Sequence, residues 1–213
     1  MAGVHEIDAL LPQTQCGECG YPGCRPYAEA LTQKKAPIDR CLPGGVDTLK
    51  ALGNILNQDV APFLKEMQAK TRKPALAVIQ ETECIGCTKC IKACPVDAIV
   101  GAAKAMHHII NQECTGCGLC VEPCPVDCIE MVELPELRYD KDKARERFKA
   151  KQVRLLREAQ DKQQAYRKKK QLAQNHSDAA ADRLAKQNYI EQALARVKAK
   201  KGIAQSAQAN ANE

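Results

Sequence analysis

The chain has 213 residues, 13 of them cysteine, and carries a formal net charge of +6. Aromatic residues make up only 3% of it and tryptophan is absent, so the conventional apolar core before residue 137 is predicted to be thin. The sequence contains no run of about twenty apolar residues, which argues against a membrane-spanning helix, and no signal peptide. The cysteines are therefore expected to be free thiols in a reducing compartment, the cytoplasm.

Helical patterns surround the first cysteines. Apolar residues recur at helical spacing over residues 4–11, where Pro12 ends the run, and over residues 46–56. Further helices are predicted over residues 25–33 and 62–70. The pair Lys73-Pro74 ends this region, because the residue before a proline avoids helical backbone angles. An N-terminal domain is therefore predicted over residues 1–73.

Four cysteines of this domain form one candidate metal site: Cys16, Cys19, Cys24 and Cys41. Three are grouped and one is distant, and glycines together with Pro22 give the grouped three a loop that can bend around a metal centre. Four such thiolates fit one 4Fe-4S cluster. They also suit a structural zinc ion, so the spacing alone leaves both alternatives open.

Eight further cysteines fall into two copies of the spacing Cys-x2-Cys-x2-Cys-x3-Cys-Pro, which read CIGCTKCIKACP from residue 84 and CTGCGLCVEPCP from residue 114. Nine of the sixteen positions from residue 84 are identical thirty residues later, so the unit is a tandem repeat. Bacterial ferredoxins hold a pair of 4Fe-4S clusters with this spacing. Zinc sites usually place a spacer between two Cys-x2-Cys pairs, and cysteines three apart on a tight loop pair poorly as disulfides.

In the two-cluster pattern, the fourth cysteine of each motif binds the cluster of the other repeat. This predicts one cluster on Cys84, Cys87, Cys90 and Cys124, and another on Cys94, Cys114, Cys117 and Cys120. Gly86 and Gly116 are expected inside the loops because a side chain there would crowd the cluster. The leftover Cys128 stands where the first repeat has Ala98, which predicts a buried free thiol and not a ligand.

Short strands are predicted around both motifs. A β-branched apolar run over residues 75–79 precedes the first motif, and Ile109-Ile110 precedes the second. Return strands are predicted over residues 99–100 and 129–132. The expected product is a pseudo-twofold ferredoxin domain with two 4Fe-4S clusters over residues 74–137, in a chain of the α+β class.

Charge is distributed unequally along the chain. Residues 1–137 carry 12 Lys and Arg against 17 Asp and Glu, or −5, whereas residues 138–213 carry 20 against 9, or +11. Residues 143–174 lack Gly and Pro and are rich in helix formers, although their apolar stripe is weak. We expect a solvated, basic helical tail over residues 138–213, disordered over residues 204–213. The alternative is a basic surface for nucleic acid, anionic lipid or an acidic partner.

Three segments carry a family resemblance, in this order: IDALLPQTQCGECGYPGCRPYAEAL, RCLPGG and the paired ferredoxin motifs. They resemble the B subunits of the Rnf (Rsx) electron transport complexes over about residues 7–132. The resemblance implies that the four N-terminal cysteines bind a 4Fe-4S cluster and not zinc. It also implies electron transfer within a membrane complex that couples redox chemistry to ion movement. In that family a membrane helix precedes the matching segment. This chain is interpreted as a soluble relative, a truncated form or a peripheral subunit, with the basic tail as a candidate replacement for that anchor.

The predicted function is a three-cluster electron carrier. We expect it to take single electrons from a reductase or a ferredoxin and to deliver them to an acceptor protein, with membrane-bound Rnf-type subunits as candidate partners. Its expected location is the cytoplasm, with peripheral contact at the cytoplasmic face of the inner membrane. His5, His107, His108 and His176 are too scattered for catalysis, and His107-His108 are expected on the surface. The alternative function is an iron–sulfur protein whose tail binds nucleic acid.

Overall fold

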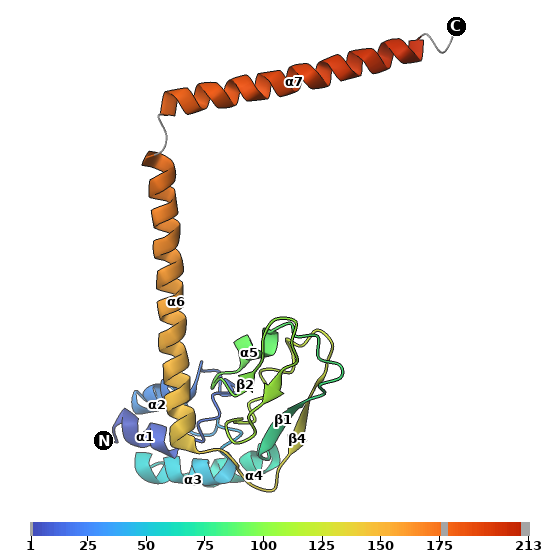
Figure 1. The fold of residues 1–213 in the computed structure, drawn as a ribbon. Helices are drawn as coiled ribbons and strands as arrows, with labels where there is room; N and C mark the ends of the chain where they lie inside the picture. The colour runs from blue at the N-terminus through green and yellow to red at the C-terminus, as the bar shows by residue number, and fades with distance from the viewer. Residues whose placement is uncertain (1, 176–178, 210–213) are drawn as a thin grey trace. The chain divides into compact units, whose positions relative to one another are not determined.

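The computed structural model of the chain describes residues 2–175 and 179–209 (Figure 1). Its contacts divide the chain into two compact units, Met1–Leu155 and Leu156–Glu213. The first unit holds all the cysteines and has two hydrophobic cores, one before Lys73 and one after it. Cysteines belong to both cores, as a thin apolar interior predicts.

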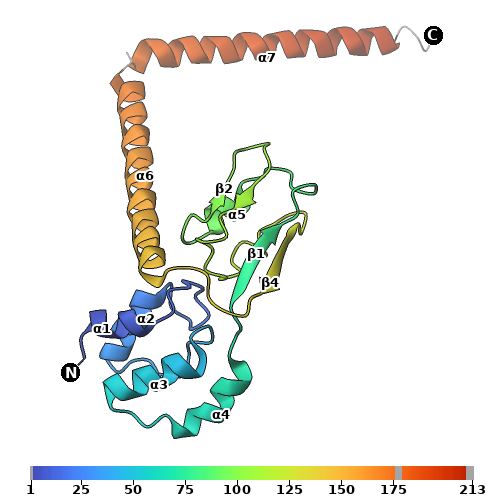
Figure 2. The same cartoon turned by 60° about the horizontal axis from the view of Figure 1, so that its bottom comes forward.

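Four helices build the N-terminal part: α1 (Val4–Leu10), α2 (Cys24–Thr32), α3 (Gly45–Leu56) and α4 (Ala61–Lys70). They confirm the helices predicted from apolar spacing. Their apolar faces meet in a core that contains Ile7, Leu11, Tyr27, Leu31, Ile38, Leu49, Leu52 and Met67. The helices are grouped on one side of the unit, and the strands lie on the other side of the linker that follows α4 (Figure 2).

The ferredoxin-type part contains two small antiparallel sheets. Strand β1 (Ala75–Ile79) pairs with β4 (Ile129–Glu133), and β2 (Ile99–Val100) pairs with β3 (His108–Ile109). All four strands were predicted. The prediction for β3, Ile109-Ile110, lies one residue after the observed strand. Each pair joins a strand of one repeat to a strand of the other. A short helix that the pattern did not predict, α5 (Lys89–Ala93), follows the first cysteine loop.

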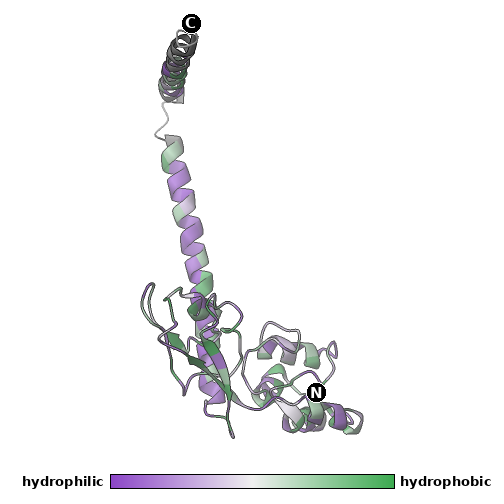
Figure 3. Cartoon of the chain, turned by 90° about the vertical axis from the view of Figure 1, so that its right-hand side faces the viewer, coloured by the Kyte–Doolittle hydropathy of each residue, from purple (hydrophilic) through white to green (hydrophobic). Residues whose placement is uncertain are grey.

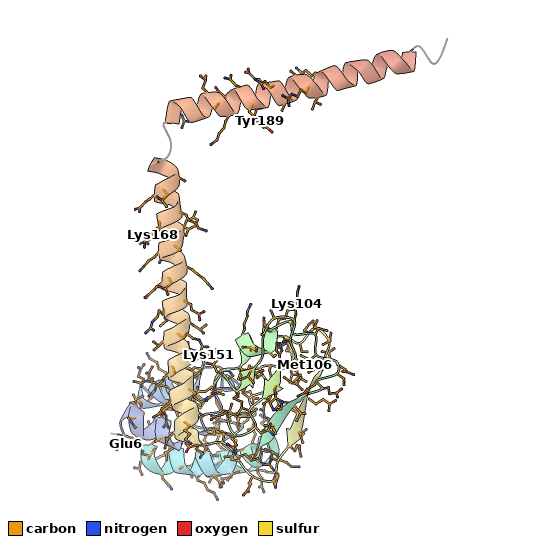
Figure 4. The ribbon with its side chains drawn as sticks, viewed as in Figure 1. Glu6, Lys104, Met106, Lys151, Lys168 and Tyr189 are labelled. Carbon is orange, nitrogen blue, oxygen red and sulfur yellow. The ribbon has the colours of Figure 1, made fainter. Side chains whose placement is uncertain are left out.

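The basic segment forms α6 (Lys141–Asn175) and α7 (Ala179–Ala209). Asp140 caps α6, because its carboxylate accepts the backbone N–H groups of Asp142 and Lys143 at 2.8 and 3.1 Å. The expectation of a solvated helix is wrong for the first turns of α6. Tyr139, Ala144 and Lys151 are buried, and Lys151 lies where α6 passes the loops of the first unit (Figure 4).

Beyond Leu155, α6 is mostly hydrophilic (Figure 3), and its side chains are exposed through Ala173. Helix α7 extends to Ala209, into the segment predicted to be disordered, and residues 210–213 lie outside the described part of the chain. None of the helices in the described ranges combines the length and the apolar character needed to cross a bilayer.

Candidate iron–sulfur sites

The structure brings the first predicted ferredoxin ligand set together. One cavity is lined by Cys84, Cys87 and Cys90 of the first motif and by Cys124 of the second. Cys128, which is 2% exposed, lines the same cavity with its Sγ 3.6 Å from the Cys124 Sγ. The prediction that Cys128 is buried is therefore confirmed. Burial, together with the neighbouring Cys124 thiol, raises the pKa of Cys128 to about 12, which favours a neutral thiol there.

The second ferredoxin set surrounds another cavity. Cys114, Cys117 and Cys120 of the second motif line it together with Cys94 of the first. The backbone N–H of Ala98 donates to the Cys94 Sγ at 3.2 Å, a contact that stabilises a thiolate. In each cavity, the fourth cysteine therefore comes from the repeat that does not supply the other three.

The four N-terminal cysteines lie within electrostatic reach of one another. Burial raises the pKa of Cys41 to about 12, and the Cys24, Cys16 and Cys19 thiols add to the rise. Burial likewise raises the pKa of Cys24 to about 12. Metal binding at Cys24 and Cys41 would therefore release their protons, because only a thiolate is a metal ligand.

A chain of buried amides holds the N-terminal cysteine loop in place. Gln15 accepts the backbone N–H of Cys24 at 2.9 Å and donates to the Gln13 side chain at 2.8 Å. Gln13 in turn donates to the backbone carbonyl of Asp8 at 2.7 Å, and Arg145 of α6 pairs with the Asp8 carboxylate at 2.7 Å. These positioning residues were not predicted, because a glutamine in a loop gives no signal of its burial.

Glycine is required in both ferredoxin loops for backbone reasons. Gly86 and Gly116 have φ values of +66° and +67°, in the left-handed region that favours glycine. A Cβ on Gly116 would lie 2.2 Å from the Ala75 carbonyl oxygen, and one on Gly86 would lie 2.6 Å from the backbone of Ala105. A side chain at Gly86 or Gly116 would therefore clash with neighbouring backbone, at the equivalent position of both loops.

The donor sets fit iron–sulfur clusters. All of these ligand candidates are soft thiols free of disulfides, which select iron–sulfur clusters or zinc over harder cations.

The expected surface position of His107 is wrong. Its side chain is buried, its Nδ1 lies 3.3 Å from the Cys90 Sγ, and its Nε2 has no hydrogen-bond partner. Gly101 packs against the ring so closely that a Cβ there would lie 2.3 Å from the His107 Cδ2. His108 is exposed and contacts Glu81 at 3.2 Å, as strand alternation allows. His5 is also exposed, and His176 lies outside the described residues.

Basic residues of α6 contact the first motif next to Cys94. The Lys151 ammonium donates to the carbonyls of Lys92 at 3.1 Å and of Cys94, and it lies 3.4 Å from the Asp97 carboxylate. Although burial raises it, the pKa of Asp97 is lowered overall by the Arg154 hydrogen bonds and by the Lys151 charge. Arg147 donates to the carbonyl of Val96 at 2.8 Å. The start of α6 is thus part of the cysteine scaffold.

Two family models match the chain. A 4Fe-4S dicluster domain matches residues 77–131, and a putative Fe-S cluster domain matches residues 11–43. The first match covers both ferredoxin motifs, and the second covers the four N-terminal cysteines. The second match favours iron and sulfur over the zinc alternative.

Curated relatives are similar over most of the first unit. The chain is 61% identical over 132 residues to the B subunit of the ion-translocating oxidoreductase complex of Hahella chejuensis, a match that covers 62% of this chain and 66% of that protein. Identity is 60% to the protein of the same name from Aeromonas salmonicida, over 62% of this chain and 70% of that protein. It is 60% to the Pseudomonas aeruginosa protein, over 62% and 68%. The chain therefore spans about two thirds of the length of these relatives.

Proposed function

The chain belongs to the family of B subunits of ion-translocating oxidoreductase complexes, and from that premise we propose that it passes single electrons through three 4Fe-4S clusters. The matched iron–sulfur domains and the family make it an iron–sulfur electron-transfer subunit. These clusters supply one-electron uptake and release when bound. The matches give no support to the alternative in which the tail binds nucleic acid, and we do not retain it.

The single observation that carries the three-cluster proposal is the grouping of twelve thiols into three sets. We assign one cluster to Cys84, Cys87, Cys90 and Cys124, a second to Cys94, Cys114, Cys117 and Cys120, and a third to Cys16, Cys19, Cys24 and Cys41. Two lined cavities support the crossed ligation of the first two sets. The mutual electrostatic influence of the N-terminal thiols supports the third. We assign Cys128 no cluster, since its raised pKa and its alanine counterpart favour a neutral thiol.

The pairing of strands across the repeats supports a pseudo-twofold arrangement of the ferredoxin domain. In a two-cluster ferredoxin, each repeat supplies one ligand to the cluster of the other, so sheets that join the repeats would fix the crossed ligands. We propose three domains: an N-terminal cluster domain (1–73), a two-cluster ferredoxin domain (74–137) and the basic segment (138–213). The start of α6 would then hold the N-terminal cluster domain and the ferredoxin domain together, because Arg145 pairs with Asp8 of the former and Lys151 donates to the Cys94 carbonyl of the latter.

For partners, we propose the other subunits of an Rnf-type complex, with a reductase or ferredoxin as the electron donor. The names of the relatives place those proteins in a complex. The proposed location is the cytoplasmic face of the inner membrane. Residues after Leu155 would contact an anionic surface there, since each exposed Lys or Arg near anionic lipid contributes about 1 kcal/mol to binding.

Metal analysis tests the three-cluster proposal. Full-length protein purified without oxygen should contain about twelve iron and twelve acid-labile sulfide per chain, four of each for every cluster. The Cys16→Ser chain should contain about eight of each, because only the N-terminal set is broken. About eight of each in the unaltered chain, or zinc in place of four irons, would contradict the third cluster.

A further inference from the structure

Arg72 lies between two of the proposed cluster sites. It stands in the linker between α4 and β1, and its guanidinium has two partners. Nη1 donates to the carboxylate of Glu18, and Nη2 donates to the carbonyl of Gly116 at 2.5 Å. Glu18 lies between Cys16 and Cys19 in the sequence, and Gly116 lies between Cys114 and Cys117. The Arg72 side chain therefore hydrogen-bonds a residue in the middle of each of the two cysteine loops.

A second contact joins the same two loops. The hydroxyl of Thr115 donates to the carbonyl of Thr14 at 2.9 Å, and both side chains are buried. The Thr14 hydroxyl lies 3.6 Å from the Cys16 Sγ, and Thr115 stands between Cys114 and Cys117 in the sequence. The path between the two thiol sets is therefore short and runs through hydrogen-bonded groups.

Tyr139, just before α6, lies within reach of both thiol sets. Its hydroxyl donates to the Pro12 carbonyl at 2.7 Å. Burial raises its pKa well above the ordinary range, and the thiols of Cys24, Cys41, Cys16 and Cys117 add to the rise. Three of these thiols are N-terminal and the fourth belongs to the second motif. Arg72, the Thr14–Thr115 bond and Tyr139 thus all place the N-terminal set beside the set of Cys94, Cys114, Cys117 and Cys120.

We propose that Arg72 is a positioning residue that couples these two sites and makes the site of Cys94, Cys114, Cys117 and Cys120 the central one. The N-terminal site then lies at one end of the electron path, and the site of Cys84, Cys87, Cys90 and Cys124 at the other. The guanidinium charge stabilises the extra negative charge that each of the two adjacent sites gains on reduction. The two loops stay in contact because its planar fork bonds both.

The inference rests on the three-cluster proposal, which metal analysis tests separately. Its own test is a potentiometric titration of the full-length, cluster-loaded protein followed by electron paramagnetic resonance. Arg72→Gln removes the charge, and Lys73→Gln is the matched control, because Lys73 is the neighbouring cation but pairs with exposed Glu133. We expect Arg72→Gln to lower the reduction potentials of the N-terminal cluster and the central cluster and to leave the third unchanged. Lys73→Gln should change none of them.

Arg72→Lys separates charge from geometry, since it retains the cation but cannot bond both loops through a planar fork. It should restore the potentials partly. Equal shifts in Arg72→Gln and Lys73→Gln, or an equal shift of all three clusters, would overturn the proposal.

Adjacency has a second readout that does not depend on how Arg72 variants fold. In the fully reduced protein, the electron paramagnetic resonance signal of the N-terminal cluster should be broadened by magnetic coupling to the spin of the central cluster. Cys117→Ser, which breaks the central site, should sharpen that signal, whereas Cys87→Ser, which breaks the other ferredoxin site, should leave it broad. The reverse pattern would show that the N-terminal site adjoins the site of Cys84, Cys87, Cys90 and Cys124, and it would overturn the proposal.

Discussion

Lys151→Met should undock the start of α6 from the end of α5 and the residues after it. The Lys151 side chain is 5% exposed, and its ammonium donates to carbonyls at and just after the end of α5 and pairs with Asp97. A helix C-terminus favours such a cation. Methionine retains the packing of the aliphatic stem but leaves these buried carbonyls without a donor.

The size of the effect follows from these partners. Hydrogen bonds to a charged group contribute about 1.5–3 kcal/mol net, and a buried acceptor left unpaired costs a similar amount. Asp97 keeps its bond to Arg154 at 2.8 Å, so the carboxylate is not left alone. We therefore expect the docking of α6 to weaken by about 2–3 kcal/mol. At about 1.4 kcal/mol per factor of ten, local opening should become roughly 30- to 140-fold more frequent.

Amide hydrogen exchange measures this opening directly in the loaded protein, over residues 144–155. The matched control is Arg154→Gln, which removes a cation of the same Asp97 group whose side chain is 51% exposed. An exposed pair contributes about 0–1 kcal/mol, so exchange should rise less than about fivefold. If exchange in Lys151→Met stayed within twofold of the unaltered chain, or matched that of Arg154→Gln, the reasoning from burial would be refuted.

Three further outcomes are expected. Cys124→Ala should lose the cluster of the first motif and keep that of the second, whereas Cys128→Ala should keep all iron; selective loss of the second-motif cluster in Cys124→Ala would contradict crossed ligation. His107→Leu should lower the potential of the cluster bound by Cys90 in a redox titration, because a donated hydrogen bond to a ligand sulfur stabilises the reduced state; exposed His108→Leu is the control, and equal potentials would refute the role. A chain ending at Leu155 should keep full iron content but lose salt-sensitive binding to anionic vesicles, and unchanged binding would show that the residues after it do not dock.

The cluster chemistry was predictable because its signals are local. Thiols separated by two or three intervening residues restrict the metal centre that a loop can wrap, whatever the rest of the fold does. Helices such as α1 and α3 were likewise predictable, since an apolar face at helical spacing needs only one partner surface. The burial of Cys128 followed from comparison of the two repeats.

Contacts between distant parts of the chain were decided by the tertiary structure alone. The strand positions were predictable, but β1 pairs with β4 across the repeats, and no single strand encodes its partner. Lys151 was expected on the surface because lysine is mostly exposed, and His107 because histidine is only intermediate in burial and nothing in the sequence marked this one as buried. They are buried because Cys90 and the carbonyls after α5 lie beside them in space. Arg72 is one more cation in the sequence, and only the fold places it between two cysteine loops, where its charge acts on both.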